Sequence, residues 1–208
     1  RRRSRALVRL LLPLASGITW RDSASALLAR QLGVVAPHGT DAVWSLPRQH
    51  WLGLGGPIVV CWRPTPHLQG QAWKPYLQAL EDLAEQTQRE VIWLPFHRDQ
   101  DQPLFNQLQQ QGLVGAALAR RSRVVEATTP SEAMALFRSA SLVLAMRLHG
   151  LILAAVAGAP CAALSYDPKV AAAAAALDCP CQDLDAPAAD DLEGRWRATL
   201  DQPPSPQR

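Results

Sequence analysis

Residues 141–170 constrain the fold more than any other part of the chain, because they contain two apolar runs that are each followed by a charged loop and a helical segment. The first run, 142–145, is short and continuous, which is typical of a strand buried on both faces. The segment 151–157 ends at Gly158 in the manner of a helix terminus. A second strand is predicted over 161–166, and Pro168 suits the first turn of the next helix.

Nearly all the charge of this stretch lies in its two loops. Arg147 and His149 follow the first strand, and Asp167 and Lys169 follow the second. Open α/β sheets bind their ligands beyond the carboxyl ends of their strands. We therefore expect these two loops to take part in one ligand site.

The same alternation runs through 58–200. Strands are predicted at 58–62, 91–94 and 124–125, and helices at 73–88, 103–111, 130–139 and 190–200. Thr129 and Pro130 are typical of a helix start, with Thr129 as the N-cap and Glu132 in the first turn. Helices that alternate with buried strands predict an α/β fold with a doubly wound parallel, Rossmann-like sheet.

The chain outside 58–200 has a different character. Residues 1–15 have a basic start and leucines at helical spacing, which favours an amphipathic helix over a secretory signal. A short strand at 18–21, a helix capped by Ser23 and a strand at 34–36 complete a first segment, 1–36. Residues 37–57 are interpreted as an interdomain linker and 201–208 as a disordered tail. Because the chain begins with arginine inside a helical pattern, we expect it to be part of a longer protein.

Composition excludes several classes of protein. A hydrophobic fraction of 48% with 19% charged residues is ordinary for an α/β protein. The net charge is only +3 and arginines cluster at the start of the chain, so the sequence does not indicate a basic surface for binding nucleic acid. Arg147 and His149 interrupt the long apolar stretch, which argues against a transmembrane segment, whereas peripheral membrane association stays open. The four cysteines lack a zinc-binding spacing and indicate a reduced, cytoplasmic protein.

Two pieces of this sequence, MRLHGLILAA at 146–155 and ALSYDPKV at 163–170, resemble the signature of the polysaccharide pyruvyl transferase family. Three upstream pieces, at 18–23, 59–64 and 91–95, fit the same family pattern in the same order. The resemblance implies two Rossmann-like domains that face a cleft, as in B-type glycosyltransferases. Residues 58–200 would be the carboxyl-terminal domain, and 1–36 a remnant of the amino-terminal domain.

The resemblance also implies an activity. Members move the enolpyruvyl group of phosphoenolpyruvate onto a sugar, here a sugar or lipid-linked saccharide of a cell-surface polysaccharide, and close it as a ketal. No cofactor and no metal are implied, and the sequence contains neither a dinucleotide-binding nor a P-loop motif.

His149 and Arg147 match the family's site. His149 falls at the proposed catalytic position, and imidazole suits proton transfer because its pKa lies near neutral pH. The alternative is a histidine that caps the following helix or bonds to the backbone. Arg147 offers a planar fork for a carboxylate or phosphate, and its alternative is an ion pair, for instance with Asp167.

Four further contacts to the substrate are expected from the resemblance or from position. Arg63 matches a family arginine that contacts phosphoenolpyruvate. The backbone N–H of Leu148 opens a helix and can hold an anion. Lys169 lies in the first turn after Pro168, where a cation is disfavoured unless an anion shares the site. For Arg21, an ion pair with a nearby acid is an equally open interpretation.

Two other functions remain open at this stage. A B-type glycosyltransferase that uses a nucleotide sugar would have the same architecture, with Asp167 as the acidic residue for the ribose. A non-catalytic fragment that binds an anion is the other alternative. Binding of phosphoenolpyruvate without binding of a uridine nucleotide would favour the pyruvyl transferase.

Overall fold

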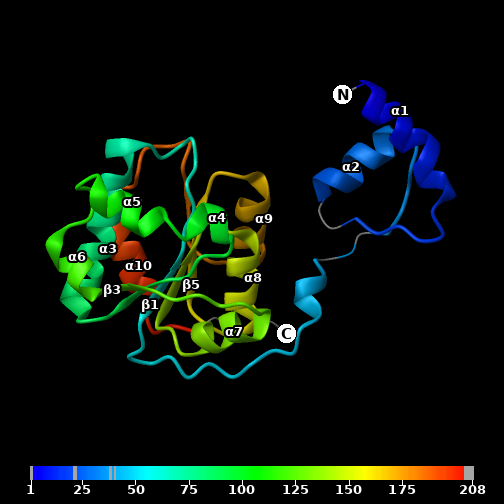
Figure 1. Ribbon diagram of the computed structural model, residues 1–208. Coiled ribbons are helices and arrows are strands. Elements are labelled where there is room, and N and C mark those ends of the chain that lie inside the picture. Colours follow the sequence, from blue (N-terminus) through cyan, green and yellow to red (C-terminus); the bar gives the residue numbers. More distant parts are fainter. Residues whose placement is uncertain (1, 21–22, 38, 40, 204–208) are drawn as a thin grey trace. The chain divides into compact units, whose positions relative to one another are not determined.

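The computed structural model describes residues 2–20, 23–37, 39 and 41–203, and its contacts divide the chain into two units, Arg1–Ser45 and Leu46–Arg208 (Figure 1). The smaller unit contains helices α1 (Arg2–Leu11) and α2 (Ser23–Gln31) and the 3-10 helices η1 (Leu12–Leu14) and η2 (Ala42–Ser45). The helix predicted over 1–15 therefore corresponds to α1 followed by η1.

The two strands predicted in the smaller unit are wrong for its described residues. The N–H of Trp20 donates to the carbonyl of Pro37 (3.0 Å), and the carbonyl of Trp20 accepts from the N–H of Gly39 (2.8 Å). These bonds make a single bridge, and residues 34–36 form no ladder. Isolated pairs of short strands are marginal, and the described part of this unit offers no third strand to support one.

The larger unit is built on six parallel strands in the order β3-β2-β1-β4-β5-β6. They are β1 (Ile58–Cys61), β2 (Val91–Trp93), β3 (Ser122–Val124), β4 (Leu142–Ala145), β5 (Cys161–Ser165) and β6 (Cys181–Asp183). At the centre, Ile58 pairs with Val91 of β2 on one side and with Leu142 of β4 on the other. The predicted doubly wound, Rossmann-like parallel sheet is confirmed. Strand β6 was missed because its sequence is mostly polar.

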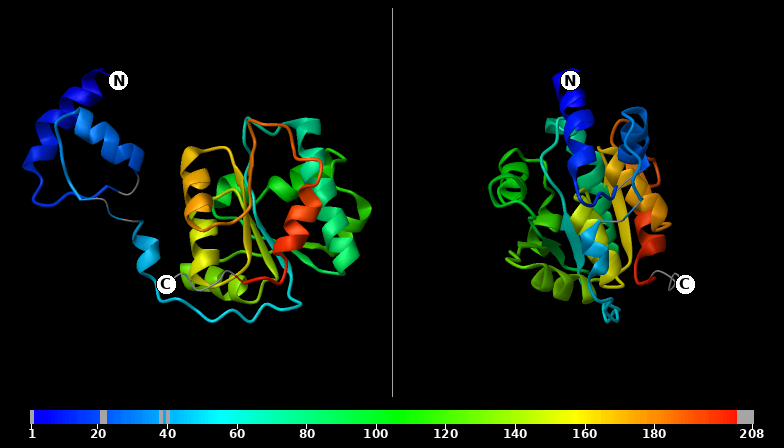
Figure 2. Two further views of the ribbon diagram at one scale, coloured as in Figure 1. Left: turned by 180° about the vertical axis from the view of Figure 1, so that it is seen from behind. Right: turned by 90° about the vertical axis from the view of Figure 1, so that its right-hand side faces the viewer.

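Helices cover both faces of the sheet, as Figures 1 and 2 show. One face carries α3 (Lys74–Thr87), α5 (Leu104–Gln110), α6 (Ala116–Arg121) and α10 (Leu192–Thr199). The other carries α7 (Pro130–Arg138), α8 (Leu148–Val156) and α9 (Pro168–Ala176). The single turn α4 (Arg98–Asp101) follows β2, and η3 (Gly70–Trp73) leads into α3. Helices α4 and α6 were not predicted.

A cluster of tryptophans fills the core between the sheet and the α3 face. Trp62, at the end of β1, is 2% exposed, and its ring lies 5.9 Å from Trp73, 5.5 Å from Trp93 and 6.3 Å from Trp196. Trp93 is 4% exposed and belongs to the same buried cluster. Because β1 carries this large ring at its end, its carboxyl terminus is firmly fixed.

Local sequence sets the starts of the helices that lead into the site. Thr129 and Glu132 form a reciprocal capping box at α7, with Pro130 in the first turn, as predicted. Asp167 caps α9 by accepting the N–H of Lys169 (2.8 Å), with Pro168 next to it. Both caps satisfy helix N–H groups that have no partner within their own helix.

The segment 46–57 belongs to the larger unit. The N–H of Gln49 donates to Val156 (2.9 Å), and the N–H of Leu52 donates to Arg138 (2.9 Å). A Cβ on Gly56 would collide with the carbonyl oxygen of Ser139, so only glycine allows this close approach. Residues of the expected linker from Leu46 onward are therefore packed against α7 and α8.

Asp201 is also anchored, although it begins the segment expected to be disordered. Its carboxylate accepts from Arg89 (2.6 Å) and from the N–H of Gly55 (3.1 Å). Residues 204–208 lie outside the described structure. Within the described residues, no helix combines the length and the apolar character needed to cross a bilayer.

Candidate functional site

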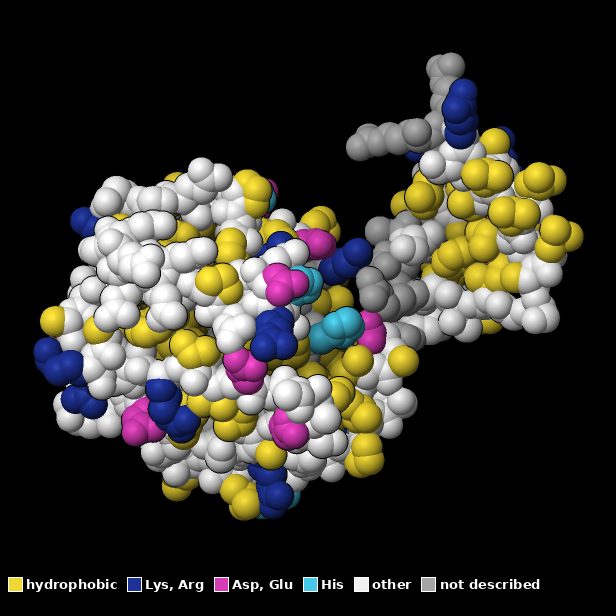
Figure 3. Space-filling model, in the orientation of Figure 1, with side chains coloured by type: hydrophobic (Ala, Val, Ile, Leu, Met, Phe, Trp, Pro, Cys, Tyr) yellow, Lys and Arg dark blue, Asp and Glu magenta, His cyan; other side chains and the backbone are white. Residues whose placement is uncertain are grey.

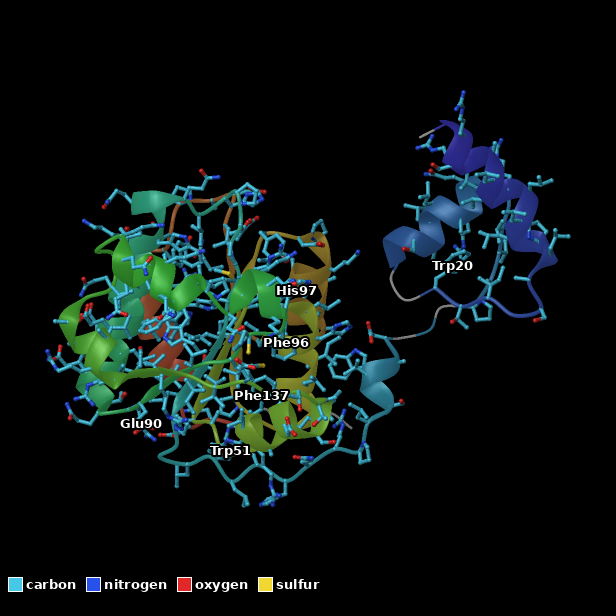
Figure 4. All side chains as sticks on the ribbon, in the orientation of Figure 1. Trp20, Trp51, Glu90, Phe96, His97 and Phe137 are labelled. Atoms are coloured by element: carbon cyan, nitrogen blue, oxygen red, sulfur yellow. The ribbon has the colours of Figure 1, made fainter. Side chains whose placement is uncertain are left out.

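Four loops meet at the carboxyl edge of the sheet. The strand order reverses between β1 and β4, and this switch point is where doubly wound sheets bind ligands. The loop after β1 carries Arg63, and the loop after β4 carries Arg147. Helix α4, which follows β2, carries Gln100 and Asp101, and the loop after β5 begins with Tyr166. Figure 4 labels His97, which follows β2 at this edge.

Arg147 makes a two-point ion pair with Asp101. Its Nε donates to Oδ2 (3.0 Å) and its Nη2 donates to Oδ1. The carboxylate of Asp101 is fully buried, whereas the side chain of Arg147 is 18% exposed. A fork of this kind fixes the plane of the guanidinium as well as its position. Arg147 is therefore held rigidly, with one edge turned to the buried carboxylate.

The loop after β2 fixes the carboxylate of Asp101 through two backbone hydrogen bonds. Its Oδ2 accepts the backbone N–H of Phe96 (3.1 Å) and that of His97 (2.9 Å). The ion pair left open for Arg147 is thus formed, but with Asp101 in place of the suggested Asp167. Sequence reasoning missed Asp101 because three neighbouring charged residues, at 98, 99 and 101, gave no sign of which one faces inward.

Arg63 converges on the same place from β1. Its Nη1 donates to the hydroxyl of Tyr166 (3.0 Å), and its guanidinium carbon lies 5.3 Å from the centre of that ring. Its Nη2 donates to Oε1 of Gln100 (3.3 Å), and the same oxygen accepts from Nη2 of Arg147 (3.2 Å). The structure therefore brings Arg63 and Arg147 together on one oxygen atom, a contact that joins residues far apart in sequence.

His149 and Leu148 lie in the first turn of α8, for which Arg147 is the N-cap. The His149 side chain is exposed at the carboxyl edge. The first amides of a helix have no acceptor within it, so the Leu148 N–H belongs to a group suited to an anion. A Cβ on Gly150 would lie 3.1 Å from Cβ of Cys61, so this turn packs tightly against β1.

Lys169 lies in the first turn of α9 with an exposed side chain. Its backbone N–H donates to Oδ1 of Asp167, so Asp167 is the N-cap of α9. The ammonium group therefore lies near a helix N-terminus, an electrostatically unfavourable place for an unpaired cation. Arg21, the remaining expected contact, lies outside the described residues.

A second histidine, which the sequence did not single out, also lies at this edge. Nδ1 of His67 lies 2.7 Å from Oδ1 of Asp185, and its ring lies 6.3 Å from the ring of Tyr166. His67 follows β1 and Asp185 follows β6, so the contact joins two segments that are far apart in the sequence. His97 is exposed nearby, and its backbone serves Asp101.

Basic residues follow three strands at this edge of the sheet. Arg63, Arg147 and Lys169 follow β1, β4 and β5, and the buried carboxylate of Asp101 pairs with Arg147. Figure 3 shows basic, acidic and histidine side chains gathered on one face of the larger unit. Within the described part of the chain, no three histidine, cysteine or carboxylate residues are placed to hold a metal ion.

The fold is shared with known glycosyltransferases of the GT-B type. A crystal structure of an S. aureus TarM mutant in complex with fondaparinux, α-GlcNAc-glycerol and UDP matches with a TM-score of 0.55 and 10% identity, covering 96% of this chain and 39% of that chain. A second TarM structure matches with a TM-score of 0.50 and 12% identity, covering 79% of this chain and 32% of that chain. The structure of Anabaena Alr3699/HepE in complex with UDP and glucose matches with a TM-score of 0.44 and 16% identity, covering 95% of this chain and 61% of that chain. This chain thus spans about two fifths of the first TarM chain.

The larger unit is an α/β unit with a doubly wound parallel sheet, and its fold is similar to that of TarM. The profile of the polysaccharide pyruvyl transferase family matches residues 1–168. The chain belongs to that family, which confirms the resemblance read from the two loops. No curated protein sequence matches the chain.

Proposed function

We propose that this chain binds phosphoenolpyruvate and transfers its enolpyruvyl group to a sugar of a cell-surface polysaccharide, forming a ketal. The observation that carries the proposal is the convergence of Arg63 and Arg147 on a single oxygen at the switch point of the sheet. Phosphoenolpyruvate has a carboxylate and a phosphate, and planar guanidinium groups bind both kinds of anion well. Family membership supports this choice of donor.

The chemistry requires two proton movements and two new C–O bonds. A proton goes to the methylene carbon of phosphoenolpyruvate, and one sugar hydroxyl attacks the neighbouring carbon. The bond from that carbon to the phosphate oxygen breaks, and a second hydroxyl closes the ketal. The two hydroxyl protons balance the new methyl group and the protonated phosphate. His149 is the proposed acid and base, because imidazole exchanges protons near neutral pH.

Each of the other site residues has a binding role in the proposal. Arg63, Arg147 and the Leu148 N–H hold the anionic groups, and Lys169 neutralises charge that develops on the leaving phosphate. The sugar or lipid-linked saccharide would approach from the exposed side of His149. Arg21 is a proposed further contact that lies outside the described residues.

One alternative has a structural observation in its favour. The fold is similar to TarM, which was crystallised with UDP, so a nucleotide-sugar enzyme has the same architecture. Such an enzyme would need an acidic residue free to bind the ribose. Asp167 already accepts the N–H of Lys169 as a helix cap, which makes it less available for that task.

Calorimetric titration of the chain with phosphoenolpyruvate and, separately, with UDP tests the proposal. We expect phosphoenolpyruvate to bind and UDP not to bind, and Arg63→Met to weaken the binding of phosphoenolpyruvate roughly 10-fold to 100-fold. The matched control is Arg120→Met, a basic residue on α6. Binding of UDP without phosphoenolpyruvate would overturn the proposal in favour of the nucleotide-sugar enzyme. Ketal formation, followed by the new methyl signal in NMR, distinguishes an enzyme from a protein that only binds the anion.

A further inference from the structure

Gln100 occupies the point on which the two arginines of the site converge. Its Oε1 accepts from Nη2 of Arg63 at 3.3 Å and from Nη2 of Arg147 at 3.2 Å. A carbonyl oxygen has two lone pairs, so both are engaged by guanidinium groups. An amide oxygen has no net charge, so Gln100 adds no negative charge between the two arginines, and Asp101 is the counterion of Arg147 alone.

The neighbouring residue on α4 behaves differently. Asp101 binds Arg147 through a fully buried carboxylate that also accepts two backbone N–H groups. Gln100 is exposed, and its oxygen contacts the arginines from the solvent side. Buried charged contacts are costly to break, whereas exposed neutral ones are exchanged with water at little cost. Asp101 is thus a permanent partner of Arg147, and Gln100 is a replaceable one.

Three neutral groups accept hydrogen bonds from the guanidinium of Arg63. They are the Pro64 carbonyl (3.2 Å), the Tyr166 hydroxyl (3.0 Å) and the amide oxygen of Gln100. The Tyr166 ring also supports the guanidinium of Arg63. The position of Arg63 is therefore set without Gln100. In the same way, Asp101 sets the position of Arg147. Removing Gln100 leaves both arginines in place, with donors pointing to the position of the lost oxygen.

We propose that Gln100 is an exchangeable cap on the anion site, whose amide oxygen stands where an oxygen of the bound ligand's carboxylate or phosphate goes. Ligand binding displaces the side chain, and the displaced contacts reduce the affinity for the ligand. Gln100 thereby sets how strongly the site binds anions without being part of the chemistry. This inference rests on the proposed function for the identity of the ligand.

Changing the charge at this position gives the sharpest test. In Gln100→Glu the new carboxylate binds the two arginines with a negative charge and competes with the ligand, so we expect affinity for phosphoenolpyruvate to fall roughly 10-fold to 100-fold. In Gln100→Ala the competing oxygen is lost, and affinity should rise severalfold. The matched control is Gln110→Glu, the same change at an exposed position on α5. Unchanged affinity in Gln100→Glu, or a loss of affinity in Gln100→Ala, overturns the proposal.

Titrations with two smaller anions identify which group of the ligand takes the place of the amide oxygen. Inorganic phosphate and pyruvate are titrated separately against the wild-type chain and Gln100→Glu. A loss of affinity for phosphate alone assigns the position to the phosphate, and a loss for pyruvate alone assigns it to the carboxylate. Equal affinities of the two chains for both probes contradict a shared position.

One measurement needs no ligand and separates this inference from the proposed function. If side chain 100 lies between the two guanidinium groups, the carboxyl introduced by Gln100→Glu should titrate at least one pH unit below the ordinary glutamate value of about 4.3 in NMR. The carboxyl introduced by Gln110→Glu should titrate near that value. An ordinary titration at both positions refutes the cap. A lowered titration in a chain that does not bind phosphoenolpyruvate refutes the proposed function and leaves the arrangement of the cap intact.

Discussion

Arg147 and Asp101 form a two-point ion pair between loops of two strands that are not neighbours in the sheet, with the carboxylate fully buried and the guanidinium partly exposed. This pair gives Arg147 two tasks. One edge of its guanidinium compensates a buried charge, and Nη2 also reaches Gln100 at the solvent side. A residue proposed to bind ligand is therefore also part of the structure that supports the site.

Breaking this pair should destabilise the protein. Asp101→Asn leaves a mostly buried guanidinium without its counterion, and we expect a loss of about 3 kcal/mol in the free energy of unfolding. Arg147→Met should cost a similar amount, because it strands the buried carboxylate. Urea unfolding measures both, with Asp99→Asn, an exposed acid on the same helix, as the control.

A double-mutant cycle decides whether the two effects share one cause. The double variant should be more stable than the sum of the single losses predicts, by about 1 kcal/mol or more, because no unpaired charge remains. Simple addition of the two losses would mean that Arg147 and Asp101 do not depend on each other. In that case Arg147 would be free to act as a ligand contact alone.

His149→Ala should separate catalysis from binding. If His149 transfers the proton, kcat for ketal formation should fall roughly 10²-fold to 10⁴-fold while affinity for phosphoenolpyruvate changes little. His97→Ala, at another exposed histidine of the same edge, is the control and should retain activity. A variant that loses binding but keeps its rate at saturation would make His149 a ligand contact.

The cysteines at the opposite end of β5 and β6 should differ in reactivity. A hydrogen bond from the Cys161 thiol lowers the pKa of the Cys179 thiol, whereas the same bond and burial raise the pKa of Cys161. Burial raises the pKa of Cys181. Because the thiolate is the reactive form, iodoacetamide should label Cys179 before the more exposed Cys181 near neutral pH. Labelling is measured by peptide mass spectrometry. Faster labelling of Cys181 would show that exposure, and not the thiol pKa, determines the order of reaction.

The capping box of α7 should make stability depend on pH. Hydrogen bonds from the backbone and side chain of Thr128 lower the pKa of Glu132 in the folded state. A lowered folded-state pKa gives stability that is fully present above the ordinary glutamate pKa of about 4.3 and is lost as the pH falls through the lower folded value. Glu132→Gln should therefore flatten the dependence of stability on pH in this acidic window. The comparison is by urea unfolding at a series of pH values, and parallel pH profiles for the two chains would rule out this contribution.

Sequence periodicity predicted the larger unit well because its strands are buried on both faces and its helices begin at strong caps. Continuous apolar runs such as Leu142–Ala145 have few other structures open to them, and Thr129 and Asp167 cap helices as their neighbours suggested. Strand β6 escaped prediction because an edge strand of polar residues has no apolar pattern. The strands predicted at 18–21 and 34–36 failed because strand formation depends on neighbouring strands that a local pattern does not reveal.

The sequence by itself determined the α/β class, the two charged loops and the family, since these depend on local order along the chain. Only the tertiary structure decided that Asp101 is the partner of Arg147, that Arg63 meets Arg147 at Gln100, and that His67 lies beside Asp185. These contacts join residues from different loops, which the parallel strands in the order β3-β2-β1-β4-β5-β6 gather at one edge of the sheet. Strand order follows from the packing of the whole sheet, and no local run of residues encodes it.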